Sequence, residues 1–182
     1  MSILVTGGAR SGKSGFAEKL TLSLSVRALY VATGQAFDEE MKERIALHQR
    51  QRAEGGATWT TLEEPLDVPG LLERYSGKEA VLVDCLTLWL SNVLLSVEDA
   101  ADRQVLVEQE ITRLEHSVRS FQGTLVMVTN EVGDGIVPEY ALGRLYRDLA
   151  GRMNARLAKH CAQVFLVTAG IPIELKSREY LL

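Results

Sequence analysis

Short apolar runs alternate along the chain with longer segments in which apolar residues recur every three or four positions. The short runs are almost continuously apolar, as expected of strands covered by helices on both faces of a parallel sheet. The longer segments have the periodicity of amphipathic helices. The alternation predicts an α/β fold with a mainly parallel sheet. The predicted strands are Ile3–Thr6, Ala28–Ala32, Ala80–Asp84, Thr124–Thr129 and Val164–Thr168, with shorter strands at Trp59–Leu62 and Ile171–Lys176.

Helical patterns fill the segments between these strands. The segment Leu86–Leu95 is too apolar to lie in water, so it is either a buried helix or part of a subunit interface. In another segment, Met41, Ile45 and His48 lie at spacings of four and three and therefore share one helical face. The remaining predicted helices are Lys13–Leu24, Asp38–Gln51, Asp102–Phe121 and Leu142–Cys161.

A glycine-rich segment directly follows the first predicted strand and precedes the first predicted helix. It matches the pattern G-x-x-x-x-G-K-[ST] throughout, as Gly7-Gly8-Ala9-Arg10-Ser11-Gly12-Lys13-Ser14. The glycines let the backbone curl around a phosphate chain, and the helix N-terminus adds partial positive charge. Lys13 brings a mobile charge to the β- and γ-phosphates, and the Ser14 hydroxyl can ligate Mg²⁺. A chance glycine turn is the alternative, but pattern, position and flanking elements favour a nucleotide-binding loop.

Carboxylates and an amide lie where other predicted strands end. In phosphate-loop proteins, an Asp placed like Asp84 commonly holds Mg²⁺ through water or polarises an attacking group. The alternative is that Asp84 caps the following helix. Asn130 and Glu131 follow another strand, and sites in parallel sheets gather at the carboxyl ends of strands. Both are therefore candidate site residues, while the roles of Glu63 and Glu64 stay open at this point.

Composition and charge narrow the functional classes. The chain has 182 residues, 46% apolar and 24% charged, which is typical of one globular domain spanning residues 1–182. A net charge of −4 argues against a nucleic-acid partner, which would need a basic face. The apolar stretches are shorter than the roughly 20 residues of a membrane span, and we expect no targeting segment. Cys85 and Cys161 adjoin apolar runs, which predicts buried free thiols and fits a cytoplasmic protein.

The histidines carry less information on pattern alone. His116 and His160 lie in charged amphipathic helices, which predicts solvated or half-buried side chains. His48 lies among basic and amide side chains that could meet a triphosphate, and a neutral imidazole can attack an α-phosphate near neutral pH. The pattern by itself nevertheless favours an ordinary exposed helical histidine.

Taken together, the chain resembles the bifunctional adenosylcobinamide kinase/adenosylcobinamide-phosphate guanylyltransferases of cobalamin assembly over nearly its whole length. A bare phosphate loop occurs in many families, so the narrower signal is that loop combined with the block from Val128 to Pro138, which reads Val-Thr-Asn-Glu-Val-Gly-Asp-Gly-Ile-Val-Pro. Further matching segments are Ile3–Ser14, Tyr30–Thr33, Asp38–Met41 with Arg44, Ile45 and His48, Trp59–Pro65, Arg147–Arg152 and Asn154.

The resemblance implies a RecA-like phosphate-loop fold, a homotrimer and two reactions. In the first, ATP or GTP phosphorylates the hydroxyl of the aminopropanol arm of adenosylcobinamide. In the second, GTP donates GMP to that phosphate, giving adenosylcobinamide-GDP and pyrophosphate. In this family the second reaction passes through a GMP–histidine intermediate, and the matching position is His48. The resemblance therefore reverses the interpretation of His48 and makes His48 and Lys13 the expected catalytic residues.

The resemblance also implies which side chains surround the nucleotide and its metal. Mg²⁺ is the expected cofactor, with Ser14 and Asp84 as its ligands. Some relatives have Glu where this chain has Asp84, and either carboxylate suits the metal. Besides the phosphate loop, the residues expected around the guanine nucleotide are Thr33, Gln49, Arg50, Gln51, Arg52, Glu63 and Asp84.

Two other functions stay open from the residues alone. A phosphate-loop kinase for another small molecule would need Lys13, Ser14 and Asp84 but not His48. A GTP-dependent switch module usually carries a guanine-reading Asn-Lys-x-Asp, whereas here Asn130-Glu131 is followed by Val132.

Overall fold

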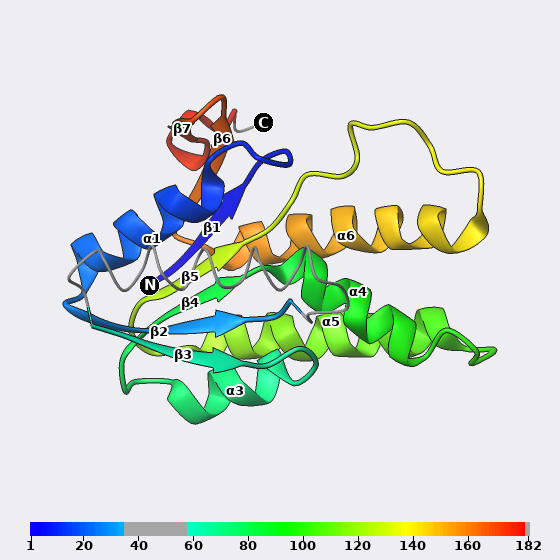
Figure 1. Cartoon of the computed structure of the whole chain (residues 1–182), viewed down its shortest axis with the longest axis horizontal. Helices are drawn as coiled ribbons and strands as arrows, with labels where there is room; N and C mark the ends of the chain where they lie inside the picture. Colours follow the sequence, from blue (N-terminus) through cyan, green and yellow to red (C-terminus); the bar gives the residue numbers. More distant parts are fainter. Residues whose placement is uncertain (35–57, 181–182) are drawn as a thin grey trace, which may run out of the picture.

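The computed structural model describes residues 1–34 and 58–180, which contain a sheet of seven strands (Figure 1). The strand order is β3-β2-β4-β5-β1-β6-β7. Every neighbouring pair is parallel except β6 and β7, which form an antiparallel hairpin at one edge. The strands are β1 Ser2–Thr6, β2 Arg27–Ala32, β3 Thr58–Glu63, β4 Ala80–Asp84, β5 Leu125–Val128, β6 Gln163–Thr168 and β7 Ile171–Glu174.

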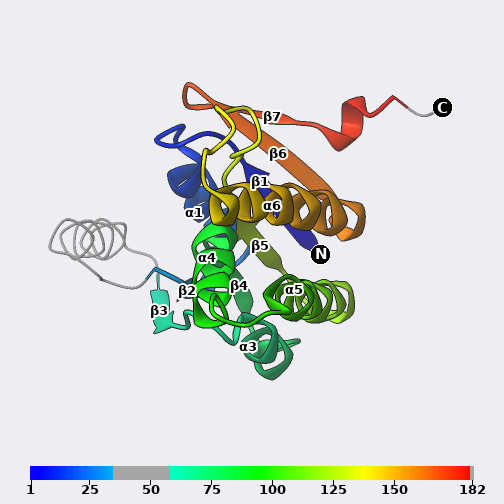
Figure 2. The same cartoon turned by 90° about the vertical axis from the view of Figure 1, so that its right-hand side faces the viewer.

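Helices cover both faces of this sheet (Figure 2). Successive residues of each strand point to opposite faces, so both faces have apolar side chains that the helices bury. Val81 and Val83 of β4 join the larger apolar core beneath α3, α4, α5 and α6, whereas Leu82 joins the smaller core beneath α1. The helices are α1 Lys13–Leu24, α3 Val68–Tyr75, α4 Leu86–Ser96, α5 Arg103–Ser120 and α6 Ala141–His160, followed by a short 3₁₀ helix at Lys176–Arg178. This arrangement confirms the predicted α/β fold with a mainly parallel sheet.

The apolar segment after Asp84 is a core helix. Helix α4 buries Leu86, Trp89, Leu90 and Val93 in the larger core, and the indole Nε1 of Trp89 donates to the Leu66 carbonyl at 2.7 Å. Of the two predictions for this segment, burial within the chain is the one that the structure supports.

Helix α3 is an element that the sequence pattern did not predict. It is short and contains Pro69 and Gly70, both poor helix formers within a helix. Its start nevertheless has two helix signals: the carboxylate of Asp67 caps the helix by accepting from the Gly70 amide at 3.1 Å, and the proline lies in the first turn.

The other predicted elements within the described residues differ from the observed ones by at most two residues at either end, and Lys13–Leu24 and Ala80–Asp84 match completely. The shorter predictions, Trp59–Leu62 and Ile171–Lys176, correspond to β3 and to the edge strand β7. The predicted helix Asp38–Gln51 lies outside the described residues. Within the described ranges, the helices are too short or too polar to cross a membrane.

Candidate nucleotide-binding site

Among the described residues, the predicted site residues Thr33, Glu63 and Asp84 come together at the carboxyl edge of the sheet. Ala32 ends β2 and lies in register between Glu63 of β3 and Asp84 of β4. Val128 of β5 is in register with Asp84 on one side and with Val5 of β1 on the other. The segments that leave this edge are therefore neighbours in space although they are far apart in the sequence.

The phosphate loop leaves β1 at the same edge and turns sharply into α1. Gly7 and Gly12 have positive φ angles of 154° and 94°, and Arg10 has a φ of 56°. A Cβ atom on Gly7 would lie 2.4 Å from the carbonyl oxygen of Val167, so glycine is required at this position by contact as well as by conformation. The hydroxyl of Ser11 is buried and lacks a hydrogen-bond partner among the described residues.

Lys13 begins α1, yet its side chain is buried. Its ammonium group folds back and donates to the Gly8 carbonyl at 3.0 Å, across the mouth of the loop. The N-cap residue of α1 is Gly12, which has no side chain to satisfy the first amide groups of the helix. The loop thus combines a buried cation with helix-terminal N–H donors, the two features that bind phosphate groups.

Asp84 ends β4 at the carboxyl edge of the sheet and is half-buried. Its Oδ2 accepts a hydrogen bond from the Tyr30 hydroxyl at 3.0 Å. The N-cap of the following helix is Cys85, and no side chain caps that helix, so the alternative role of Asp84 as its cap is wrong. The contact of Tyr30 with this carboxylate could not be predicted from the sequence, because no spacing links a mid-strand tyrosine to the end of another strand.

Thr33 holds two strand ends together. Its hydroxyl donates to the Cys85 carbonyl at 2.7 Å and accepts from the Cys85 amide at 2.9 Å. Its own carbonyl accepts from the side-chain amide of Asn92 at 2.8 Å. The fully buried Thr33 side chain is therefore engaged within the protein, and burial raises the pKa of the neighbouring Cys85 thiol.

Asn130 lies beside this group and joins β5 to α4. Its side-chain amide donates to the Thr87 hydroxyl at 2.7 Å, while its carbonyl accepts from Asn154 of α6 at 3.3 Å. Tyr146, also from α6, donates to the Thr87 carbonyl at 3.0 Å, and burial raises its pKa to about 12. Asn130 thus links the end of β5 to the start of α4, and Thr87 and Tyr146 were not found from the sequence.

Glu131 is tied to the phosphate loop through its backbone. Its amide donates to the Gly7 carbonyl at 3.1 Å, and its carboxylate accepts from the Gly133 amide at 2.7 Å. The side chain of Arg147 donates to the Gly133 carbonyl and anchors the same segment to α6. The candidate Glu131 is therefore adjacent to the phosphate loop, although its carboxylate is directed to its own turn.

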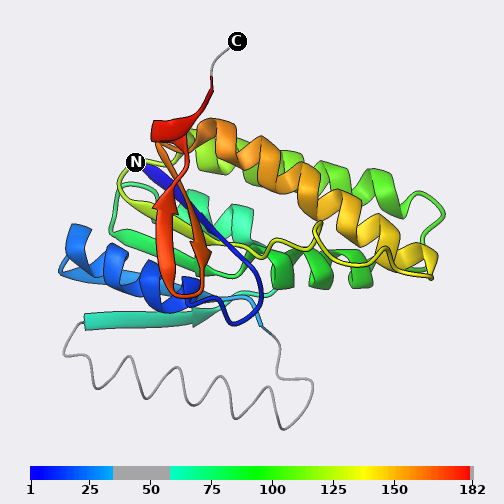
Figure 3. The same cartoon turned by 90° about the horizontal axis from the view of Figure 1, so that it is seen from above.

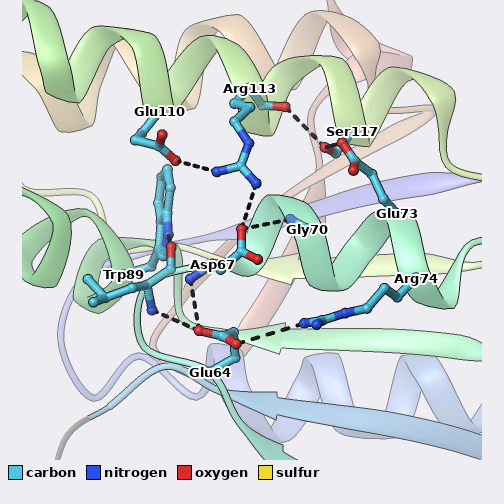
Figure 4. Close-up of polar contacts among 10 residues, drawn as sticks. Glu64, Asp67, Gly70, Glu73, Arg74, Trp89, Glu110, Arg113 and Ser117 are labelled. Carbon is cyan, nitrogen blue, oxygen red and sulfur yellow. Dashed lines mark hydrogen bonds and ion pairs between the residues drawn. The ribbon is translucent and has the colours of Figure 1, made fainter.

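Glu63 and Glu64 have different environments. Glu63 is exposed at the end of β3. The carboxylate of Glu64 instead accepts from the Asp67 amide at 2.8 Å and stabilises the turn into α3 (Figure 4). In the same figure Arg113 of α5 donates to the Asp67 carboxylate at 2.7 Å. Glu64 is thus part of the β3–α3 connection, and Glu63 is the carboxylate of this pair that stays available to a ligand.

A pocket of about 540 Å³ lies beside this connection, between α4 and α5. Its lining includes Leu66, Asp67, Val93 and Arg113 and contains no residue of the phosphate loop. It is therefore a feature separate from the phosphate-binding region.

The expected nucleophile and the residues after it lie outside the described residues. These are His48, Gln49, Arg50, Gln51 and Arg52. The other two histidines are described: His116 is exposed, and His160 is half-buried, with its Nε2 2.8 Å from a carboxylate oxygen of Glu115. Both cysteines are buried free thiols, as predicted.

Comparison with known proteins identifies the family. A family model described as cobinamide kinase / cobinamide phosphate guanyltransferase matches residues 3–175. The chain belongs to this family. Two relatives are bifunctional adenosylcobalamin biosynthesis proteins: CobP of Pseudomonas aeruginosa is 42% identical over 97% of this chain and 98% of its own length, and CobU of Escherichia coli is 40% identical over 97% of this chain and its full length, 100%. The expected bifunctional kinase and guanylyltransferase family is thereby confirmed.

A solved structure supports the fold independently of the family. A prototypical ATPase from the type III secretion system of pathogenic bacteria aligns with a TM-score of 0.53 at 12% identity. The alignment covers 100% of this chain and 58% of that ATPase. At this identity the likeness shows the fold alone, and it confirms the expected RecA-like phosphate-loop architecture.

Proposed function

We propose that this chain phosphorylates adenosylcobinamide with ATP or GTP and then transfers GMP from GTP to adenosylcobinamide phosphate. The observation that carries the proposal is a complete phosphate loop at the carboxyl edge of the sheet, in a chain that matches the family from residue 3 to residue 175. We further propose that residues 1–182 form one catalytic domain serving both reactions, in the cytoplasm where both nucleotides are abundant.

In the phosphorylation step, the described residues would mainly position the triphosphate. The backbone amides of the phosphate loop and of the first turn of α1 would donate to the phosphate oxygens. Lys13 would exchange its hydrogen bond with the Gly8 carbonyl for the β- and γ-phosphates. The substrate hydroxyl attacks the γ-phosphorus, its proton leaves to a base or to solvent, and the nucleoside diphosphate departs.

In the transfer step, an imidazole nitrogen of His48 would attack the α-phosphorus of GTP. A P–N bond forms, and the bond from that phosphorus to the bridging oxygen breaks, which releases pyrophosphate. The phosphate of the corrinoid substrate then attacks the same phosphorus, and the P–N bond breaks. One difficult displacement becomes two easier ones, while Lys13 offsets the charge on the departing pyrophosphate.

Mg²⁺ fits the donors near the phosphate loop. The described residues contain no group of three or more acidic, histidine or cysteine side chains that would form a complete metal cage. Mg²⁺ usually takes only one or two protein ligands and completes its shell with phosphates and water. We assign Ser14 and Asp84 as those ligands, with Tyr30 orienting the carboxylate. When bound with the nucleotide, the metal would neutralise phosphate charge.

The proposed homotrimer rests on the resemblance and on one exposed apolar segment. In the connection between β5 and α6, Ile136 is 97% exposed, Tyr140 69% and Val137 59%. Large apolar side chains at such exposure commonly mark a contact surface.

The two reactions can be separated by paired variants. We expect His48→Ala to retain phosphorylation of adenosylcobinamide and to lose GMP transfer, because only the transfer uses the imidazole. We expect Lys13→Ala to impair both reactions by about 100-fold or more, since both use the same phosphate loop. The measurement follows each product by chromatography with labelled nucleotide. If His48→Ala still makes adenosylcobinamide-GDP, the proposed transfer mechanism is wrong; if the wild type makes only the phosphate, the chain is a kinase alone.

A further inference from the structure

The hairpin of β6 and β7 lies against the phosphate loop (Figure 3). The pairing of Thr168 with Ile171 leaves a two-residue turn made of Ala169 and Gly170. Their φ angles are 51° and 79°. Two successive left-handed residues are the signature of a type I′ turn, whose second position strongly favours glycine.

This turn contacts the phosphate loop through its backbone. The amide of Gly170 donates to the Ser11 carbonyl at 2.9 Å. A Cβ atom on Gly12 would lie 3.4 Å from the Gly170 Cα, so a side chain at this position would pack directly against the turn. The loop also accepts a backbone hydrogen bond from the segment after β5, where the Glu131 amide donates to the Gly7 carbonyl. The hairpin turn therefore holds the far end of the loop, next to Lys13.

The hydrogen bond to Ser11 also orients an amide group. A peptide bond is planar and trans, so its C=O and N–H point in opposite directions. Holding the Ser11 carbonyl toward the hairpin turns the Gly12 N–H away from it. The backbone amides of a phosphate loop are the donors that cradle the phosphates. The position of Gly170 consequently affects one of these donors without touching the nucleotide.

We propose that Gly170 is a positioning residue for nucleotide binding: the hairpin turn fixes the Ser11–Gly12 peptide in the orientation that binds phosphate. The proposal rests on the proposed role of the phosphate loop. In this role the edge hairpin pre-organises the phosphate loop, so that the loop does not have to become ordered when the nucleotide binds.

The chain offers a matched control for this proposal. Gly77, between α3 and β4, has a φ of 75° and donates its amide to the Gln122 carbonyl at 2.8 Å. It lies at the amino edge of the sheet, opposite the phosphate loop. A Cβ atom added at Gly170 would have no neighbour within 4 Å, and one added at Gly77 would have its nearest neighbour at 3.8 Å. The Cβ atom added by a substitution at either glycine therefore acts through backbone conformation and not through a clash.

The test measures GTP binding by calorimetry and thermal unfolding in parallel. We expect Gly170→Val to raise the Kd for GTP about 10-fold, the scale set by left-handed backbone in a non-glycine residue. Gly170→Asn should stay within about threefold, because Asn tolerates this conformation. Gly77→Val should lose similar thermal stability but keep GTP affinity within about twofold, since distant sites act independently. At steady state, Gly170→Val should raise KM and leave kcat within about twofold.

The inference would be overturned if folded Gly170→Val bound GTP with wild-type affinity while its melting temperature fell as much as that of Gly77→Val. If Gly170→Val does not fold, Gly170→Ala replaces it, with the same direction expected and the same overturning result. Lys13→Ala separates this failure from failure of the proposed function. Loss of GTP binding in Lys13→Ala together with normal binding in the Gly170 variant refutes the hairpin's role alone. Normal binding in Lys13→Ala would mean that the phosphate loop is not the GTP site.

Discussion

Lys13 illustrates how individual side chains are held ready for a ligand. Its buried ammonium group donates to the Gly8 carbonyl, so the charge is already held against the phosphate loop. Tyr30 does the same for Asp84 by fixing one of its carboxylate oxygens. Binding then replaces existing hydrogen bonds and does not have to order mobile side chains, which reduces the entropic cost.

Asn92 carries a structural prediction at the residue scale. Its buried side-chain amide donates to the carbonyls of Thr33 and Pro65, at 2.8 and 3.1 Å, and joins α4 to two strand ends. Asn92→Ala would leave both carbonyls without this donor, and we expect the free energy of unfolding to fall by about 2–3 kcal/mol. Urea unfolding measures this, with the neighbouring Ser91→Ala as the control, expected within about 0.5 kcal/mol of wild type. Equal stability of Asn92→Ala and wild type would show that this bridge is not needed.

The residues of the site differ in how far the sequence could predict them. Gly7 to Ser14 were predictable because the phosphate loop is one continuous segment whose spacing fixes its shape. The Asn92–Thr33 contact was not, because its partners are 59 residues apart and meet only through the packing of α4 on the sheet. The same holds for Gly170 and Ser11, which join segments from opposite ends of the chain.

At the scale of elements, α5 and α6 are joined by a cluster of charged side chains. The Nε2 atom of His160 lies 2.8 Å from one carboxylate oxygen of Glu115, and the Nε of Arg156 donates to the other at 2.8 Å. The hydrogen bond from His160, and to a smaller extent that from Arg156, lowers the pKa of Glu115 below its ordinary value of 4.5. The folded protein therefore binds a proton at Glu115 less readily than the unfolded chain does.

This difference gives the pH dependence a definite sign. The stabilisation by Glu115 is fully present above the ordinary pKa of 4.5 and is lost as the pH falls through the lower pKa of the folded state. We expect Glu115→Gln to lose stability at pH 6 and to show a smaller further loss than wild type between about pH 4.5 and pH 3. Urea unfolding across this range, with the exposed Glu98→Gln as control, measures it. Parallel curves for Glu115→Gln and wild type would contradict the assignment.

Elements were predictable where their pattern is long or strongly apolar. The continuous apolar runs gave β1, β4 and β5 closely, because parallel strands buried on both faces need such runs. Helix α3 was missed because Pro69 and Gly70 obscure a short helix whose stability comes from packing and from its Asp67 cap. The pairing order of the strands depends on contacts across the whole sheet, which periodicity does not report.

At the scale of the whole molecule, the exposed apolar segment after β5 gives a test of the proposed homotrimer. A trimer of 20.1-kDa chains has a mass of about 60 kDa, which analytical ultracentrifugation would measure. We expect Ile136→Asp to shift the protein toward the monomer, because it would bury a charge at the contact. Val26→Asp is the control, since Val26 is also exposed, at 85%, but precedes β2 at the amino edge. A monomeric wild type, or an Ile136→Asp trimer as stable as wild type, would contradict this surface.

At the scale of the whole molecule, the proposed second reaction depends most on the proposed covalent role of His48. The direct measurement is to incubate the protein with Mg²⁺ and GTP labelled at the α-phosphate, denature it and look for label on the chain. We expect bound label that is acid-labile and alkali-stable, as a phosphoramidate is, and that is absent from His48→Ala. No bound label in wild-type protein that binds GTP, or equal labelling of His48→Ala, would contradict a GMP–histidine intermediate at this position.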